Sequence, residues 1–413
     1  MKNTRVALMH SFSALLYNSY ASHPAFRSGN SWCIGHAQHD LEKFNRLYNQ
    51  MSTACSKGFP RLTDLIEAKQ GLGQLMAALR HQALEPYEKN FLQELEAEIL
   101  RVLDHDYALF AKRRRPDFFT RVIFQKHKPF LEKLNSQRFF IDKLPEDAVK
   151  KILHLGGPHL ELFRERMAMG KLTREDLSFN SGPEATKITK ILNEEFEKTG
   201  INDAVSEYMN QPMQVGGQAF ELSVSQAQWW RNGFMGLSRT PDTLYAHLDE
   251  SIGAPKAIVY LTDVTVDNGP TGYYQALYES LGLNPLQEII GRVLANIGGA
   301  TASPLKDYYK KAYHQSMTSE NFRRHFMLLP QEIRFNSHFG WDIFPGSEAE
   351  SAMKGLERKM TGPAGTFLVF DGSKLLHRGG LVNQGERIAL QVVFGSARRP
   401  KLRKRIASQY LSY

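Results

Sequence analysis

The pattern of hydrophobic and polar positions divides this chain into two parts of different character. Between residues 62 and 111, apolar side chains recur every three or four positions, which is the period of a helix that buries one face. Helical spacing continues over 121–134 and 147–155, where Gly156-Gly157-Pro158 is expected to end the run. It returns over 183–198, just before Gly200. The first part of the chain is therefore predicted to be mostly helical.

Strand-like patterns begin near residue 213. Residues 216–225 alternate in polarity, and 257–262 and 365–371 are short apolar runs. Helical spacing reappears between about 273 and 335, so we expect a helical insertion that acts as a lid or as a buttress. The predicted organisation has three parts, which are a mostly helical region packing on the core (1–205), a strand-rich catalytic core (206–400) and a basic C-terminal tail (401–413).

Composition is that of an ordinary globular protein with a sizeable core. Of the 413 residues, 42% are hydrophobic and 23% are charged. The two cysteines, Cys33 and Cys55, imply no disulfide framework and fit a reducing cytoplasm. Polar residues interrupt the apolar stretch 6–17, so we expect a first helix there rather than a signal sequence. No run of the sequence predicts a transmembrane segment.

The net charge of +9 is concentrated in two clusters, residues 112–115 and 398–405. Such clusters attract nucleic acid, anionic lipid or a phosphorylated substrate, or they form a solvated basic surface. A nucleic-acid partner is disfavoured, because the sequence has neither zinc-finger spacing nor an aromatic-glycine RNA-recognition motif.

His247 and Asp249 form the motif that organises the candidate chemistry. In an extended strand, residues i and i+2 point to the same side, so both side chains can reach one metal ion. His377 follows a second strand-like run and can supply a third ligand from across the sheet. Two histidines and one carboxylate on one face are the ligand set of non-haem Fe(II) enzymes. A metal site at His247, Asp249 and His377 is therefore predicted.

Two other groups have metal-ligand residue types at short spacing. His159 and Glu161 belong to an amphipathic stretch in which i and i+2 diverge on a helix, so we interpret them as a solvated helix face. His36 and His39 lie one helical turn apart at a predicted helix start, without further ligands nearby. Neither pair is predicted to bind metal.

Taken together, these motifs resemble the phytanoyl-CoA dioxygenase-like family of Fe(II)/2-oxoglutarate oxygenases. The similarity covers roughly residues 210–400, and the matching segments are Tyr245–Asp249, Val259–Val264, Asn268–Pro270, Gly365–Asp371, His377–Gly380, Asn383 and Glu386-Arg387. The resemblance implies an α+β fold whose catalytic core is a double-stranded β-helix, also called a jelly roll or cupin-like barrel. It implies His247, Asp249 and His377 as iron ligands, with 2-oxoglutarate and O2 as co-substrates.

Two further residues receive roles from the same resemblance. Arg387 would bind the far carboxylate of 2-oxoglutarate, for which a planar, permanently charged guanidinium is well suited. Thr262 would contact the same co-substrate. The implied activity is hydroxylation, or another oxidation, of an unactivated C–H bond, with succinate and CO2 as co-products. Asp249 favours hydroxylation, because related halogenases replace this carboxylate with a small residue.

The substrate is not specified by the sequence. Family members often carry Pro-Gly-Ser-His after the Asn-Gly turn, whereas this chain has residues 272–275 with the sequence Gly-Tyr-Tyr-Gln. Two hypotheses stay open, a small or carrier-bound metabolite and an anionic glycan, lipid or CoA-type substrate. Two alternative functions also stay open, a cupin-type iron enzyme that does not use 2-oxoglutarate and a non-catalytic jelly-roll binding protein.

Overall fold

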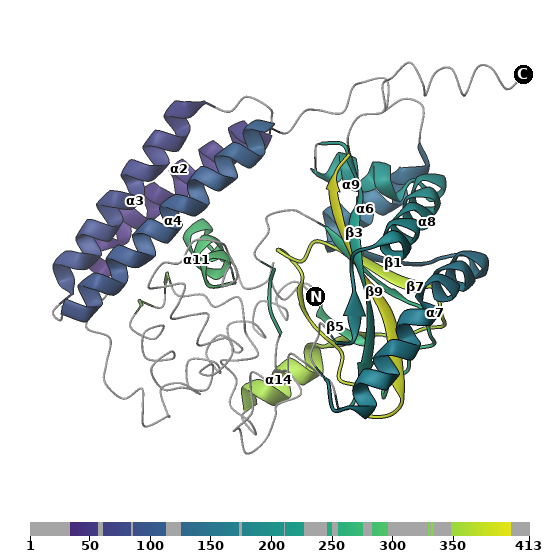
Figure 1. Cartoon of the computed structure of the whole chain (residues 1–413). Coiled ribbons are helices and arrows are strands. Elements are labelled where there is room, and N and C mark those ends of the chain that lie inside the picture. The colour runs from purple at the N-terminus through teal and green to yellow at the C-terminus, as the bar shows by residue number, and fades with distance from the viewer. Residues whose placement is uncertain are drawn as a thin grey trace, which may run out of the picture.

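The computed structural model shows helices packed with two antiparallel sheets (Figure 1). The residues it describes are 34–56, 61–83, 86–112, 125–172, 176–209, 211–226, 246–249, 255–275, 283–295, 329–330, 332–333 and 348–397. The prediction of a mixed helix and sheet fold is confirmed. None of the described helices combines the length and apolar character needed to cross a bilayer. The stretch 6–17 and residues 113–115 and 398–413 lie outside the described residues.

One hydrophobic core lies within a cluster of helices. It joins α2 (Gln38–Ser56), α3 (Leu62–Gln82), α4 (Pro86–Lys112) and α11 (Pro285–Ala295), and short η2 (Gly35–Ala37) precedes α2. Leu286 and Ile289 of α11 are fully buried there, and the Leu286 amide donates to Asn45 Oδ1 at 3.1 Å. The helix that the sequence placed in an insertion therefore packs on the N-terminal helices, as Figure 1 shows.

The six-stranded sheet has the order β1-β7-β4-β9-β3-β2, and the second sheet has the order β6-β5-β8. All pairings are antiparallel. The strands are β1 (Phe139–Lys143), β2 (Ser178–Phe179), β3 (Met213–Val224), β4 (Lys256–Tyr260), β5 (Thr271–Tyr274), β6 (Arg358–Met360), β7 (Thr366–Phe370), β8 (Leu376–Arg378) and β9 (Glu386–Ser396). Two strands of the large sheet, β1 and β2, come from before residue 206, in the region that was predicted to be mostly helical. The division at 205 and the closure into a double-stranded β-helix stay predictions.

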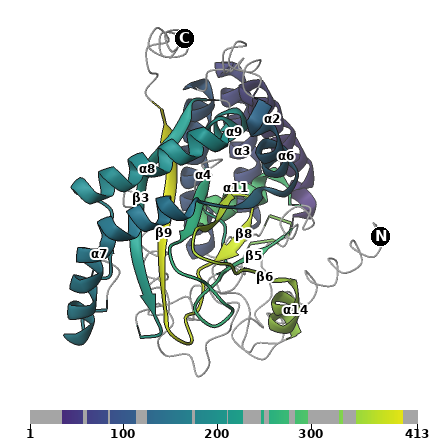
Figure 2. The ribbon, with the colours of Figure 1, turned by 90° about the vertical axis from the view of Figure 1, so that its right-hand side faces the viewer.

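Helices cover one face of the six-stranded sheet. They are α6 (Lys128–Gln137), α7 (Glu146–Ala168), α8 (Pro183–Thr199) and α9 (Ile201–Met209), with short η3 (Gln125–His127) before α6. Successive residues of β4 point to opposite faces of the large sheet. Ala257 and Val259 pack with the helices, whereas Tyr260 packs with residues of the small sheet. Figure 2 shows β5, β6 and β8 on the side of β9 away from α7 and α8.

Tyr260 connects the two sheets. Its hydroxyl donates to the carbonyl of Met360 at 3.0 Å and accepts from the amide of Thr271 at 2.8 Å. Phe370 and Leu368 of β7 lie in the same cluster between the sheets. This face of the large sheet, directed toward the small sheet, is called the inner face below.

The prediction that Gly156-Gly157-Pro158 ends a helix is wrong, because α7 continues through all three residues. Proline removes one backbone donor and usually kinks a helix. Here the helix is held against the sheet, because Gly156 lies on the ring of Phe220 so closely that a Cβ would overlap it. By contrast, the helix predicted over 183–198 is confirmed, and Gly200 with φ of 84° ends it in the left-handed region.

Candidate metal centre

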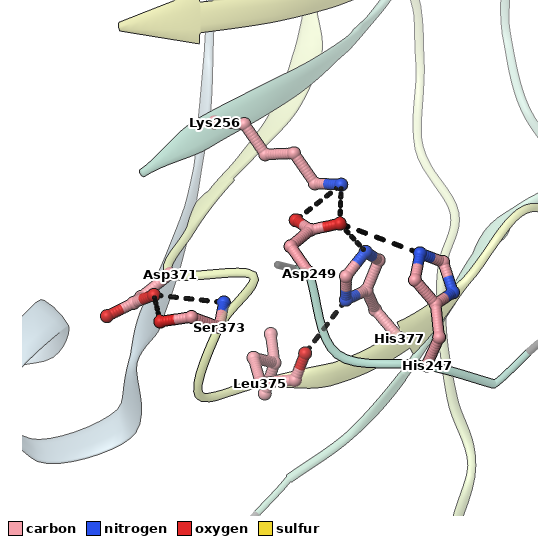
Figure 3. Close-up of polar contacts among 7 residues, drawn as sticks. All are labelled: His247, Asp249, Lys256, Asp371, Ser373, Leu375 and His377. Atoms are coloured by element: carbon pink, nitrogen blue, oxygen red, sulfur yellow. Dashed lines mark hydrogen bonds and ion pairs between the residues drawn. The ribbon is translucent and has the colours of Figure 1, made fainter. Parts of the chain in front are cut away.

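The structure brings the three predicted metal ligands together (Figure 3). His247 and His377 form an isolated antiparallel bridge, in which the His247 amide donates to the His377 carbonyl at 2.8 Å and the reverse bond is 3.0 Å. Asp249 Oδ1 lies 3.6 Å from Nε2 of each histidine. One ligand atom from each residue falls within 4.8 Å of the others. Two histidines and a carboxylate therefore converge on one point.

His377 is oriented as a metal-binding histidine would be. Its Nδ1 lies 2.8 Å from the carbonyl of Leu375, and because a carbonyl can only accept, Nδ1 carries the proton. The lone pair is thus on Nε2, directed toward Asp249 and His247. That nitrogen is buried and has no hydrogen-bond partner. Leaving a buried acceptor unpaired is costly, so its chemistry fits a metal ion at this point.

Asp249 is held by the loop that precedes His377. Its amide donates to the carbonyl of Gly372 at 2.8 Å, and the backbone of Gly372 passes so close that a Cβ there would overlap the Asp249 carboxylate. The loop is itself fixed by Asp371, a fully buried carboxylate. Asp371 accepts from the Ser373 hydroxyl and from the Tyr208 hydroxyl, both at 2.6 Å. Burial and the negative charge of Asp371 raise the pKa of Tyr208, so the phenol remains a donor.

Lys256, which sequence reasoning missed, also reaches this site. Its Nζ lies 2.7 Å from Oδ2 of Asp249 and 2.9 Å from Oδ1. Burial alone would raise the pKa of Asp249, but the charge of Lys256 and the nearby imidazoles of His377 and His247 hold it well below its usual range. Burial and the charge of Lys256 also lower the pKa of His377, which keeps that imidazole neutral. The alternation of β4 places Lys256 on the same face as Ile258, but it does not show that Lys256 reaches Asp249.

Arg387 is buried on the inner face of β9 and lacks a carboxylate partner among the described residues. Its guanidinium donates to the carbonyl of Gly269 and to the hydroxyl of Ser223, the latter at 3.1 Å, while Nε is buried and unpaired. A buried, unpaired charge is strongly unfavourable, so this arginine fits an anion. Gly269 leads into β5, whose Tyr273 pairs with His377. Gly269 and Tyr273 are four positions apart, so the backbone between the contact of Arg387 and the partner of His377 spans at most about 14 Å.

Thr262 lies beside the start of the strand that carries Arg387. Its hydroxyl accepts a hydrogen bond from the amide of Ile388 at 3.2 Å, and the neighbouring Leu261 amide donates to the Ile388 carbonyl at 2.9 Å. Thr262 thus holds β9 in place near Arg387. Its predicted contact with a co-substrate stays a prediction.

The two other candidate pairs, His159 with Glu161 and His36 with His39, are not part of a metal site within the described ranges. His159 lies in α7 and stacks on Phe179 with ring centroids 3.8 Å apart, while Glu161 on the same helix is exposed. His36 and His39 are exposed near the start of α2. In that part of the chain, the one group of three metal-ligating side chains is His247, Asp249 and His377.

No protein-family profile and no curated protein matches this sequence. Among solved structures, the chain is similar to the non-haem α-ketoglutarate-dependent epimerase SnoN from nogalamycin biosynthesis, at 12% identity over 66% of this chain and 83% of that chain, with a TM-score of 0.33. It is also similar to iron-bound HygX from Streptomyces hygroscopicus (13% identity, 66% and 87% coverage, TM-score 0.30). A third is iron-bound EctD from S. alaskensis (11% identity, 64% and 75% coverage, TM-score 0.33). These scores are too low to support an assignment, which must rest on the residues of this chain.

Proposed function

We propose that this protein is an Fe(II)/2-oxoglutarate-dependent dioxygenase with a double-stranded β-helix core. The proposal is carried by the presence, in one fold, of a buried nitrogen without a hydrogen-bond partner and a buried positive charge without a carboxylate partner among the described residues. His377 directs a buried, unpartnered Nε2 toward His247 and Asp249, and Arg387 is buried without a carboxylate within the described residues. The first group fits a divalent cation and the second fits an anion.

Each side chain of the site has a role that follows from its position. His247, Asp249 and His377 would hold iron on one face and leave the remaining positions open for co-substrates. Arg387 would bind the far carboxylate of 2-oxoglutarate through its unpaired Nε and its remaining N–H groups, with Thr262 nearby as a second donor. The ring of Phe370, centred 4.7 Å from that of His377, excludes water from one side of the ligands. Bound iron, 2-oxoglutarate and O2 would supply the oxidation of an unactivated C–H bond, with succinate and CO2 as co-products.

For the reaction and its setting we propose hydroxylation by a cytoplasmic enzyme of the phytanoyl-CoA dioxygenase-like type. The retained carboxylate of Asp249 supports hydroxylation over halogenation. The substrate would be a small, lipid or carrier-bound molecule. If it is anionic, deletion of the basic cluster 398–405 should raise KM, whereas a neutral substrate should be nearly unaffected.

Anaerobic titration with Fe(II) and 2-oxoglutarate tests the proposal through the visible metal-to-ligand charge-transfer band. The wild type should show the band, and His247→Ala should lose it. Arg387→Ala should need at least about tenfold more 2-oxoglutarate, because charged hydrogen bonds to a buried carboxylate contribute about 1.5–3 kcal/mol each. Arg358→Ala, which removes an exposed arginine of β6, is the matched control.

Each alternative function predicts a different result in the same titration. Folded wild type that binds Fe(II) but gives no band with 2-oxoglutarate would indicate a cupin-type iron enzyme. Folded wild type that binds no Fe(II) would indicate a non-catalytic binding protein, and the proposal would be abandoned.

A further inference from the structure

Lys256 occupies a fixed position inside the candidate metal centre. It is the first residue of β4 and lies on the inner face, paired in register with Phe370 of β7 and Val393 of β9. Its Nζ stands 5.2 Å from the centroid of the Phe370 ring, and about a quarter of its side chain (24%) is exposed. A cation above an aromatic face is held there by the electrostatics of the ring. The ammonium is therefore directed at the ligands by its strand and by Phe370.

Lys256 contacts both oxygens of Asp249, whereas only one of them faces the two histidines (Figure 3). Oδ1 lies 3.6 Å from Nε2 of both His247 and His377, where it would complete the metal site. Oδ2 lies 2.7 Å from Nζ of Lys256, and Nζ also reaches Oδ1 at 2.9 Å. The ammonium thus contacts both the oxygen that faces the histidines and the oxygen that does not.

We propose that Lys256 is an internal cation that competes with the metal for Asp249 and lowers the affinity of the site for divalent cations. The inference rests on the proposed metal centre and goes beyond it, since nothing in the ligand set itself requires a lysine. The ammonium lies against the partly buried carboxylate and offsets its charge. A divalent cation entering beside Oδ1 must share that carboxylate with Lys256 and remain close to a like charge.

The charges at the site explain why this competition affects function. The ammonium of Lys256 and the carboxylate of Asp249 carry charges of opposite sign and lie 2.7 Å apart, so this pair gives a divalent cation no net attraction. A dianionic co-substrate would restore that attraction. Binding of the metal and of 2-oxoglutarate should therefore be coupled more strongly in the wild type than in a variant without the lysine charge, and the coupling is reciprocal.

The test is anaerobic calorimetric titration of the metal-free, full-length protein with Co2+ alone, a readout that does not depend on turnover. Lys256→Met should bind Co2+ at least tenfold more tightly than wild type. Lys256→Gln keeps a hydrogen-bond donor but removes the charge, so it should also bind more tightly, while Lys256→Arg should stay close to wild type. Lys359→Met removes an exposed lysine of β6 and controls for the change in net charge. Circular dichroism establishes that each metal-free variant is folded.

The outcomes separate this inference from the proposed function. If wild type binds no Co2+, the metal centre itself is refuted. If wild type binds Co2+ while Lys256→Met and Lys256→Gln bind equally or more weakly, the competition is refuted. Weaker binding would mean that Lys256 instead positions Asp249. Adding 2-oxoglutarate gives a second readout, because it should tighten Co2+ binding more in wild type than in Lys256→Met. An equal effect in both proteins would contradict the proposed coupling.

Discussion

At the scale of single residues, Gly372 determines whether the carboxylate of Asp249 can lie where the histidines need it. A Cβ on Gly372 would overlap the Asp249 carboxylate, and the Gly372 carbonyl also accepts from the Asp249 amide. We expect Gly372→Ala to displace the carboxylate and weaken Co2+ binding at least tenfold, measured by calorimetric titration. Small displacements of a preorganised ligand have large effects of this kind.

Gly355→Ala provides the control for Gly372→Ala. Gly355 lies in α14 (Glu348–Leu356), and a Cβ there would meet no atom within 4 Å. Its Co2+ affinity should equal that of wild type. If Gly372→Ala bound Co2+ as tightly as Gly355→Ala, the close approach of the loop to Asp249 would have no role in metal binding.

Tyr208 of α9, which contacts the same loop through Asp371, gives a pH-dependent prediction. Its hydroxyl donates to buried Asp371 at 2.6 Å, and burial with the charge of Asp371 raises the pKa of Tyr208. Because the pKa of Tyr208 is higher in the folded protein than in the unfolded chain, where it is near 10, the shift stabilises the fold below pH 10. This contribution is lost as pH rises above 10, because the phenol ionises in the unfolded chain first. Tyr208→Phe should cost about 1–3 kcal/mol at pH 8, because Asp371 loses a donor.

Denaturant unfolding at several pH values between 8 and 11 measures this effect. The free energy of unfolding of wild type should fall more steeply above pH 10 than that of Tyr208→Phe, so the two curves should converge. Tyr260 and Tyr273, whose pKa values are also raised by burial, are present in both proteins and leave the difference unaffected. Parallel curves would show that Tyr208 has no linked proton.

At the scale of elements, helix α7 contacts strand β3 through Gly156, whereas the adjacent Gly157 has free space where a side chain would lie. A Cβ on Gly156 would overlap the ring of Phe220, which is fully buried, whereas a Cβ on Gly157 would meet nothing within 4 Å. Gly156→Ala should therefore destabilise the protein by about 1–3 kcal/mol through overpacking. Gly157→Ala should stabilise it by about 0.5–1 kcal/mol, since alanine favours a helix interior.

Urea unfolding of the two variants beside wild type measures both effects. Since the two substitutions add the same methyl group to the same helix, only the contact with Phe220 distinguishes them. Equal changes in the unfolding free energy would mean that helix propensity alone determines the outcome and that the close approach to β3 is unimportant.

The same elements show how far the sequence could predict the structure. The spacing of His247 and Asp249 predicted that both side chains reach one point, and the structure brings them together with His377, although His247 lies in an isolated bridge rather than in a strand. The end of α8 was also predictable, since Gly200 is a local signal. The continuation of α7 through Pro158 was not, because it depends on contact with Phe220, sixty-two residues later in the sequence.

Lys256 and β1 were missed for a related reason. A lysine at the start of a strand is usually exposed, and only the pairing of β4 with β7 places this one at Asp249. Strand β1 is five residues long and lies between two helices, so its local pattern is weak. Its place beside β7 is set by pairing across more than two hundred residues.

At the scale of the whole molecule, the described residues form separate hydrophobic cores. The helical cluster of α2, α3, α4 and α11 buries one set of side chains, and the six-stranded sheet with α6–α9 buries another, with no described residue in both. Figure 1 shows the two groups side by side. Because cooperativity follows shared packing, we expect two calorimetric unfolding transitions rather than one.

Matched core substitutions assign the two transitions. Leu286→Ala removes a fully buried side chain of α11 and should lower the midpoint temperature of the helical-cluster transition only. The expected loss in the unfolding free energy of that cluster is about 2–5 kcal/mol. Phe196→Ala, which removes the ring packed on Phe367 and Phe394, should lower only the transition of the sheet, and with it the temperature at which Co2+ binding is lost. A single transition lowered by both substitutions would mean that the helical cluster and the sheet unfold as one unit. The metal centre would then depend on the packing of α11 as much as on its own sheet.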